Sequence, residues 1–199
     1  SSFGTQFSSP VMCRYNLDGT IDGSFANNNG YISVTQRYGS YDADLAQADV
    51  NSQRIVTIQF TTDKKIIKQY DLDGNPIAGF GSMGTVEVLD PNPDSGFKKV
   101  VLDYLNNVYI IKSKTENFNT TLLVEKYNSA GAPDTSYGNG GLFEYVYNSA
   151  DSNTAFSSVT VQNDNKLLIS GERTKLSVDN NGYTIRLNTN GTLDTGFSI

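Results

Sequence analysis

Asn16-Leu17-Asp18-Gly19-Thr20-Ile21-Asp22-Gly23-Ser24-Phe25 is the first copy of a pattern that this chain of 199 residues repeats three more times. We call this ten-residue stretch the repeat phrase, and its later copies span residues 71–80, 128–137 and 188–197. The glycine at its fourth position recurs after 55, 57 and 60 residues, at Gly19, Gly74, Gly131 and Gly191. Such a period predicts an array of similar units, because each unit has an apolar face that only its neighbour can cover.

The repeat phrase contains the residues of a tight turn. Its glycine accepts a positive φ, and the Asn or Asp before it can bond the backbone two residues further on. Three positions after the glycine, the first, third and fourth copies carry an acidic residue: Asp22, Asp134 and Asp194. The second copy carries Ile77 there. Three positions later every copy carries an aromatic residue: Phe25, Phe80, Tyr137 and Phe197. We expect the Asp to cap the next bend and the aromatic ring to fill the seam between adjacent units.

Runs rich in β-branched and aromatic residues predict short strands on both sides of the repeat phrase. The third unit has four such runs, at Lys98–Tyr104, Val108–Ser113, Thr121–Tyr127 and Leu142–Tyr147. The second unit has the same four, at Asp44–Asp49, Arg54–Thr61, Lys65–Tyr70 and Thr85–Leu89. The first unit has two, Val11–Tyr15 and Tyr31–Gln36, and the fourth has three, Ser157–Gln162, Lys166–Ser170 and Tyr183–Leu187. The stretch Asp42–Val50 is the only helical candidate, and its place in the repeat favours a strand.

The repeat phrase and its flanks resemble a known family. The pattern Tyr-Asn-x-x-Gly-x-x-Asp-x-x-Phe/Tyr-Gly, preceded by a hydrophobic-x-Arg/Lys strand (Arg14, Lys126 and Arg186), is similar to the delta-60 repeat of bacterial surface and secreted proteins. The turn Asp164-Asn165-Lys166 also resembles the one that joins the first two strands of a unit in that family. The resemblance implies propeller-like blades and a secreted or cell-surface protein, and it supplies no general catalytic residues.

The sequence therefore predicts an all-β fold, a β-propeller-like array of four-stranded antiparallel blades with about 3.5 to 4 repeats. We expect a single domain over residues 1–199, with units at roughly 1–40, 41–96, 97–150 and 151–199. Because the first and last units lack strands, a closed four-bladed ring and a partial propeller completed by another copy or chain both stay open. The segment Thr5–Ser8 could supply the missing strand of the last blade. Incomplete end blades favour self-association.

Composition argues against several classes of function. A net charge of −6 disfavours nonspecific binding to nucleic acid, and the pairs Lys64-Lys65 and Lys98-Lys99 are interpreted as solvated strand ends. Histidine is absent, which removes the commonest general base and zinc ligand. Cys13 is the only cysteine, so we expect a buried structural thiol. No apolar run is long enough to span a membrane, and the many Asn, Thr, Ser and Tyr residues favour a secreted or surface location.

Two groups of residues are candidates for ligand binding. Asp71-x-Asp73-Gly74-Asn75 resembles the opening of a calcium loop, but it lacks the later ligands, and a repeated β-turn accounts for it more simply. We therefore expect no cofactor, with calcium at Asp71 and Asp73 as the alternative. The aromatic residues Tyr31, Tyr38 and Tyr41 could stack on a glycan, although loop packing is the simpler interpretation.

Catalysis is the competing hypothesis. Glu87 and Glu144 lie at comparable places in the last strand of the second and third units, and paired carboxylates cleave glycosidic bonds in some enzymes. Acidic residues on a solvent-facing strand are nevertheless common. The sequence favours a noncatalytic extracellular or surface module that binds protein or carbohydrate or takes part in an assembly. The alternative is a glycoside-cleaving propeller enzyme.

Overall fold

The fold is described from a computed structural model, which covers residues 11–33, 44–51, 53–60, 63–90, 98–116, 119–147, 152–175 and 180–197. Within these ranges thirteen strands form four antiparallel sheets, each built from strands that are consecutive in the sequence. The first sheet pairs β1 (Val11–Cys13) with β2 (Tyr31–Ser33). The second contains β3 (Asp44–Val50), β4 (Ile55–Phe60), β5 (Lys64–Tyr70) and β6 (Thr85–Leu89).

The other two sheets continue the same meander. The third contains β7 (Lys98–Leu102), β8 (Val108–Glu116), β9 (Asn119–Tyr127) and β10 (Leu142–Tyr147). The fourth contains β11 (Ser152–Val161), β12 (Leu167–Lys175) and β13 (Asn180–Leu187). The prediction of an all-β fold with two, four, four and three strands in successive units is confirmed for the described ranges.

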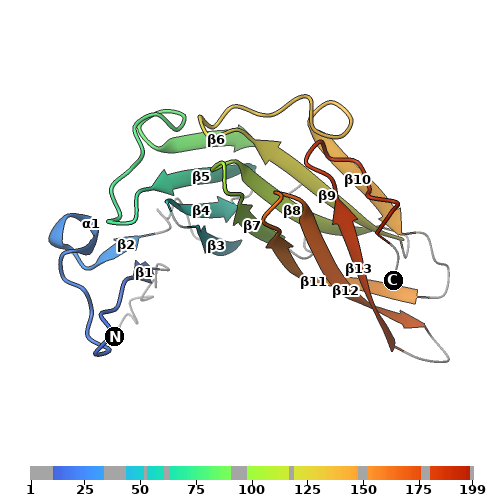
Figure 1. The fold of residues 1–199 in the computed structure, drawn as a ribbon, viewed down its shortest axis with the longest axis horizontal. Helices are drawn as coiled ribbons and strands as arrows, with labels where there is room; N and C mark the ends of the chain where they lie inside the picture. The colour runs from blue at the N-terminus through green and yellow to red at the C-terminus, as the bar shows by residue number, and fades with distance from the viewer. Residues whose placement is uncertain are drawn as a thin grey trace, which may run out of the picture.

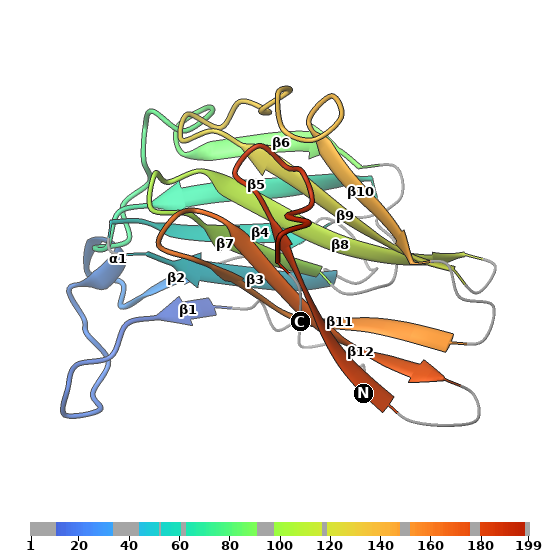
Figure 2. The same ribbon diagram turned by 45° about the vertical axis from the view of Figure 1, so that its right-hand side comes forward.

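The sheets follow one another along an arc (Figures 1 and 2). The first strands of three successive sheets lie side by side, because β7 contacts both β3 and β11. Each later strand of a sheet lies further from this inner row, as in a propeller blade. The described sheets form no closed ring, with β1 and β2 at one end of the arc and β11 to β13 at the other (Figure 1).

Three apolar layers hold neighbouring sheets together. Alternate side chains of one strand enter different layers, because successive Cβ atoms of a strand point to opposite faces. In β8, Val108 and Ile110 pack toward the second sheet, whereas Tyr109 and Ile111 pack toward the fourth. The third sheet is thus buried on both faces, and each fully buried aliphatic or Phe side chain contributes about 1.5–3 kcal/mol. The first layer is smaller and is centred on Phe25.

Several strand boundaries differ from the prediction. β1 ends at Cys13, and Tyr15, which was predicted to belong to it, forms only an isolated bridge with Ile21. The strands of the fourth sheet are longer than predicted, with a bulge between Phe156 and Ser158. The added strand residues include polar ones such as Thr154. These parts of the strands therefore show no apolar pattern in the sequence from which they could be predicted.

One short element was not predicted. The four-residue turn α1 (Phe25–Asn28) follows the first repeat phrase, and Ala26, Asn27 and Asn28 have positive φ there. The second and third units use glycines after their aromatic residues, with positive φ at Gly81 and Gly138. The first unit therefore makes the same bend with residues that adopt this conformation less readily.

Some expectations fall outside the description or need correction. Thr5–Ser8, Tyr38 and Tyr41 lie outside the described residues, and the unit boundaries stay predictions. Cys13 was expected to be a buried structural thiol, and the structure shows it partly buried. No helix in the described ranges is long and apolar enough to cross a membrane.

Candidate functional site

The junction between units is the feature that the repeat phrase builds. A Cβ atom added at Gly74 would lie 2.9 Å from Cε2 of Phe25, the aromatic residue of the preceding phrase. At Gly131 it would lie 3.3 Å from Cε2 of Phe80, and at Gly191 2.9 Å from the ring of Tyr137. The glycine is therefore needed twice, once for its positive φ and once because the ring leaves no room for a side chain.

A backbone hydrogen bond accompanies each of these ring contacts. The residue after the aromatic donates its N–H to the carbonyl oxygen of the residue before the next glycine. The distances are 2.8 Å from Ala26 to Asp73, 2.9 Å from Gly81 to Ala130 and 2.8 Å from Gly138 to Asn190. We call the ring contact and this hydrogen bond together the clasp. Three clasps join the four sheets in sequence.

An ion pair orients the aromatic ring of three repeat phrases. Asp22 accepts from Arg14 at 2.8 Å, Asp134 pairs with Lys126 at 3.1 Å, and Asp194 accepts from Arg186 at 2.8 Å. Each cation also lies over the ring of its own phrase, at 5.1 Å for Phe25, 5.8 Å for Tyr137 and 4.5 Å for Phe197. The pair and the ring contact fix the direction in which the aromatic side chain points.

The Asp side chains also cap the bend that follows. The Oδ1 atom of Asp22 accepts from the backbone N–H and the hydroxyl of Ser24, and Asp134 does the same with Ser136. The bond from the Ser24 hydroxyl is the largest cause that lowers the pKa of Asp22, and Arg14 adds to it. For Asp194, the nearby Lys166 ammonium is the largest cause of a lowered pKa. These carboxylates are therefore held in their charged form.

The second unit lacks the ion pair and obtains its cation elsewhere. Gln69 and Ile77 occupy the positions of the cation and the Asp. Arg54, at the start of β4, donates to Gln69 at 2.6 Å and to the backbone carbonyl of Ser129 in the next phrase at 3.1 Å. Arg14 makes the equivalent contact one junction earlier, to the carbonyl of Leu72 at 2.6 Å. Sequence reasoning missed Arg54, because it does not stand at the recurring cation position two residues before a repeat phrase.

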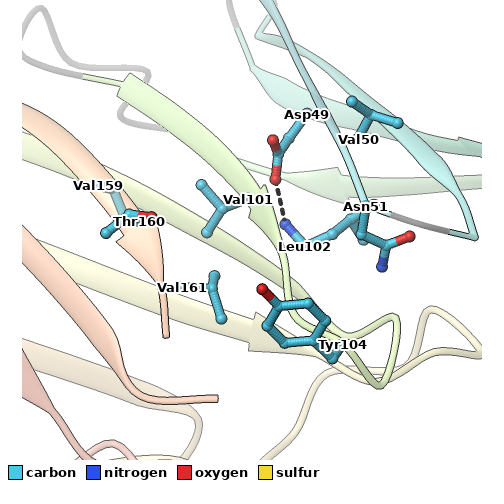
Figure 3. A pocket seen from close by; sticks show the side chains of 9 residues that line it. All are labelled: Asp49, Val50, Asn51, Val101, Leu102, Tyr104, Val159, Thr160 and Val161. Atoms are coloured by element: carbon cyan, nitrogen blue, oxygen red, sulfur yellow. Dashed lines mark hydrogen bonds between the residues drawn. The ribbon is translucent and has the colours of Figure 1, made fainter. Parts of the chain in front are cut away.

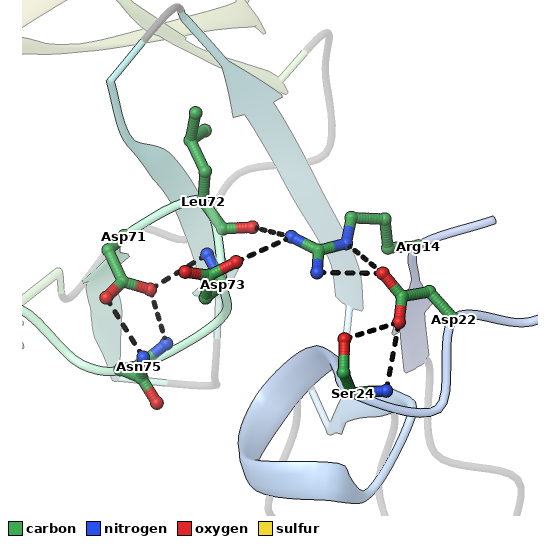
Figure 4. A network of polar contacts seen from close by, with 7 residues as sticks. All are labelled: Arg14, Asp22, Ser24, Asp71, Leu72, Asp73 and Asn75. Carbon is green, nitrogen blue, oxygen red and sulfur yellow. Dashed lines mark hydrogen bonds and ion pairs between the residues drawn. The ribbon is translucent and has the colours of Figure 1, made fainter. Parts of the chain in front are cut away.

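The calcium candidates belong to a network of polar contacts at the first junction (Figure 4). Asp71 accepts from the backbone N–H groups of Asp73 and Asn75 at 3.0 and 2.8 Å, and from the Asn75 side chain at 3.0 Å. Asp73 accepts from Arg14 at 3.0 Å. Both carboxylates therefore already have partners within the protein. In the described ranges no three His, Cys, Asp or Glu side chains gather closely enough to hold a metal ion.

A pocket of about 330 Å³ lies where β3, β7 and β11 meet (Figure 3). Apolar side chains line one part of it, namely Val101, Val159 and Val161. The polar groups around it are bonded to the protein: Asp49 accepts from the Leu102 N–H at 2.7 Å. Tyr104 donates its hydroxyl hydrogen to Asn163 at 3.0 Å. The inner strands therefore form an open hollow with a mixed lining, in which valine side chains stand beside carboxylate, amide and hydroxyl groups.

A network of buried charges joins the second and third sheets, and it corrects one prediction. Lys65 is only 3% exposed and pairs with Glu125 of β9, so its interpretation as a solvated strand end is wrong. Lys112 of β8 lies 3.3 Å from Glu125 and 2.8 Å from Asp90. Burial lowers the pKa of Lys65, whereas the two lysines outweigh the effect of burial on Glu125 and lower its pKa. The alternation of β5 places Lys65 on the same face as the buried Ile67, which was the available signal.

The remaining candidates are not gathered at one place. Glu87 of β6 pairs with Lys64 at 2.9 Å, and Glu144 is exposed on β10 of the next sheet. Glu144 lines a second hollow of about 400 Å³ beside the clasp of Gly138 and Gly191. Tyr31 is exposed on β2, at the end of the array.

The comparisons with known proteins agree with the fold. Residues 3–25 and 162–197 match a family model described as a domain of unknown function (DUF5122) beta-propeller. These segments contain the first and the last copies of the repeat phrase. Searches of curated proteins and of solved structures found no match. The match supports a β-propeller repeat family, and the assignment to delta-60 repeats stays a prediction.

Proposed function

We propose that the chain is a noncatalytic β-propeller-like repeat module, secreted or at the cell surface, which takes part in an assembly or binds protein or carbohydrate. One observation carries the proposal: the charged and polar groups of the repeat phrase serve to join units. Asp22 and Asp73 both engage Arg14, and Asp71 closes its own turn. The two side chains that were candidates for calcium binding, Asp71 and Asp73, therefore take part in a turn and in a junction between units.

Ligand binding by the inner strands is favoured by the pocket between β3, β7 and β11. Its mixed lining of valine side chains and hydrogen-bonding groups suits a segment of a protein or a sugar ring. The exposed Thr160 lies in this lining, so Thr160→Trp fills the pocket without opening the core. We expect Thr160→Trp to abolish binding to a glycan or peptide array, and Val146→Trp, at an exposed position of β10, to leave binding unchanged.

The catalytic alternative is tested on the same protein. Glycoside hydrolysis by the purified chain, lost in Glu87→Gln or Glu144→Gln, would overturn the noncatalytic proposal. We expect no turnover with the unmodified chain and no difference in either variant. Calorimetry with Ca²⁺ and then with a chelator tests the site at Asp71 and Asp73. A heat of binding that Asp73→Asn removes would contradict the structural role given to these residues.

A further inference from the structure

The two ends of the arc carry the two halves of a clasp. At the first end is Gly19, the glycine of the first repeat phrase, with φ of 83° like its counterparts. A Cβ atom added there would have no described neighbour within 4 Å, whereas the fourth-position glycines of the other three phrases, Gly74, Gly131 and Gly191, each lie against an aromatic ring. Leu17, two residues earlier, is fully exposed. The first phrase therefore presents the glycine half of a clasp without its ring.

The face around Gly19 is also open. Tyr15 occupies the same place before the repeat phrase as Tyr70, Tyr127 and Leu187. Those three are 6%, 3% and 0% exposed, because the preceding sheet covers them, whereas Tyr15 is 63% exposed. Ile21, inside the phrase, is exposed as well. These residues form an apolar surface of the kind that a preceding unit covers at every other junction.

The last unit carries the ring half. Phe197 is the aromatic residue of the fourth phrase, and Arg186 lies 4.5 Å from its ring centroid. Phe25, Phe80 and Tyr137 are each at most 1% exposed beneath the next unit, whereas Phe197 is half-buried. Among the described residues, no glycine of a later phrase lies against Phe197.

The polar groups at the two ends are complementary in the same way. At the first junction Arg14 uses Nε for its own Asp22 and Nη1 for the carbonyl of Leu72 and the carboxylate of Asp73. Arg186 stands at the same place before the fourth phrase and also uses Nε for its own Asp194. In the first phrase, Leu17 and Asp18 occupy the places of Leu72 and Asp73. The last unit therefore offers a guanidinium where the first unit offers a carbonyl and a carboxylate.

We propose that the last unit of one copy of this chain docks head to tail on the first unit of a second copy, with Phe197 on Gly19 and Arg186 at Leu17 and Asp18. The proposal rests on the function proposed above, and it names the partner of the assembly. Three internal junctions carry it with the same contact of ring on glycine and the same backbone hydrogen bond, and the first of them also shows the arginine contact. Such an interface is heterologous, so the copies close into a ring if the rotation permits and otherwise extend.

Sedimentation velocity over a series of protein concentrations tests the proposal. We expect the unmodified chain to associate, and Tyr15→Glu or Phe197→Ala to remain monomeric when alone. The control Leu105→Glu changes an exposed apolar residue elsewhere and should associate like the unmodified chain. A mixture of Tyr15→Glu, whose last unit is intact, with Phe197→Ala, whose first unit is intact, should form a dimer with one copy of each.

Two results would overturn the proposal, and they affect the proposed function differently. If the unmodified chain stays monomeric, the head-to-tail interface is rejected. The proposed ligand binding is not affected by that result, because the array experiments test it separately. Association that neither variant weakens also rejects the interface, but it supports assembly through another surface. If a variant unfolds by circular dichroism, Ile21→Glu, at another exposed apolar position of the first unit, replaces Tyr15→Glu, and Arg186→Gln replaces Phe197→Ala. The same results are expected from these two variants, alone and mixed.

Discussion

The same ten-residue phrase has different surroundings in the middle of the chain and at its beginning. Gly131 lies under Phe80 and beside the Gly81 backbone, whereas Gly19, with nearly the same φ, has open space at its Cβ position among the described residues. The turn is therefore formed by the phrase itself, and the clasp is formed by the neighbour. This comparison separates the cost of local backbone strain from the energy of joining two units.

The largest difference is expected when the ring is removed. Phe80→Ala deletes a side chain with no exposed surface and should lower the free energy of unfolding by about 3–5 kcal/mol. The matched change Phe197→Ala removes a half-buried ring with one cation contact, and about 1 kcal/mol is expected. Urea unfolding of the two variants measures both values. Equal losses would show that the interior clasp adds nothing to stability.

A glycine substitution sharpens the same comparison with a smaller effect. Gly19→Ala should cost about 1–2 kcal/mol, the ordinary penalty for an L-residue in left-handed backbone. Gly131→Ala carries that penalty and also forces a methyl group against Gly81 and Val86, which adds about 1–3 kcal/mol. Thermal and urea unfolding of the pair give the difference directly. A difference near zero would mean that the junction relaxes around the new methyl group.

The smallest expected effect is a dependence of stability on pH. The folded protein lowers the pKa of Asp22, Asp134 and Asp194, so their contribution is complete above the unfolded value of about 3.9. It is lost as the pH falls through the lower folded values. Asp134→Asn should therefore reduce the loss of stability between about pH 5 and pH 2. The second phrase has Ile77 at this position and no carboxylate to protonate. Ile77→Asn should therefore leave the pH dependence of stability unchanged, and it serves as the control. The pKa of Asp134 is lowered mainly by the hydrogen bond from the Ser136 hydroxyl and further by Lys126. If Asp134→Asn and the unmodified chain lose the same stability on acidification, the Asp134 carboxylate is not a cause of that loss.

The strands could be predicted because their apolar faces lie on the layers between sheets. β4 and β8 are buried over most of their length, and their β-branched residues make them visible in the sequence. The ends of β11 and β12 could not be predicted, because backbone pairing between polar residues such as Thr154 and Arg173 leaves no such pattern. The turn α1 was hidden for a similar reason, since positive φ at Ala26 is imposed by the clasp and not by residue type.

The junction chemistry could be anticipated only within the repeat phrase. The glycine and the aromatic residue are visible because they recur, but their contact joins residues about 50 positions apart and no pattern in one unit reveals it. The buried pair of Lys65 and Glu125 comes from two different sheets, and Arg54 replaces a cation at another position. Arg54 thus makes the contact to the next repeat phrase from a different position in the sequence, and a search for recurring residues does not find it.

The three clasp hydrogen bonds give each junction its own reporter. The N–H groups of Ala26, Gly81 and Gly138 are donated across the boundary between neighbours, so each becomes open to solvent exchange when its own junction separates. Deuterium uptake at these three amides would rank the joints by the frequency with which they part. A chain that unzips from its ends would exchange at Ala26 before Gly81, whereas one cooperative unit would exchange at all three together.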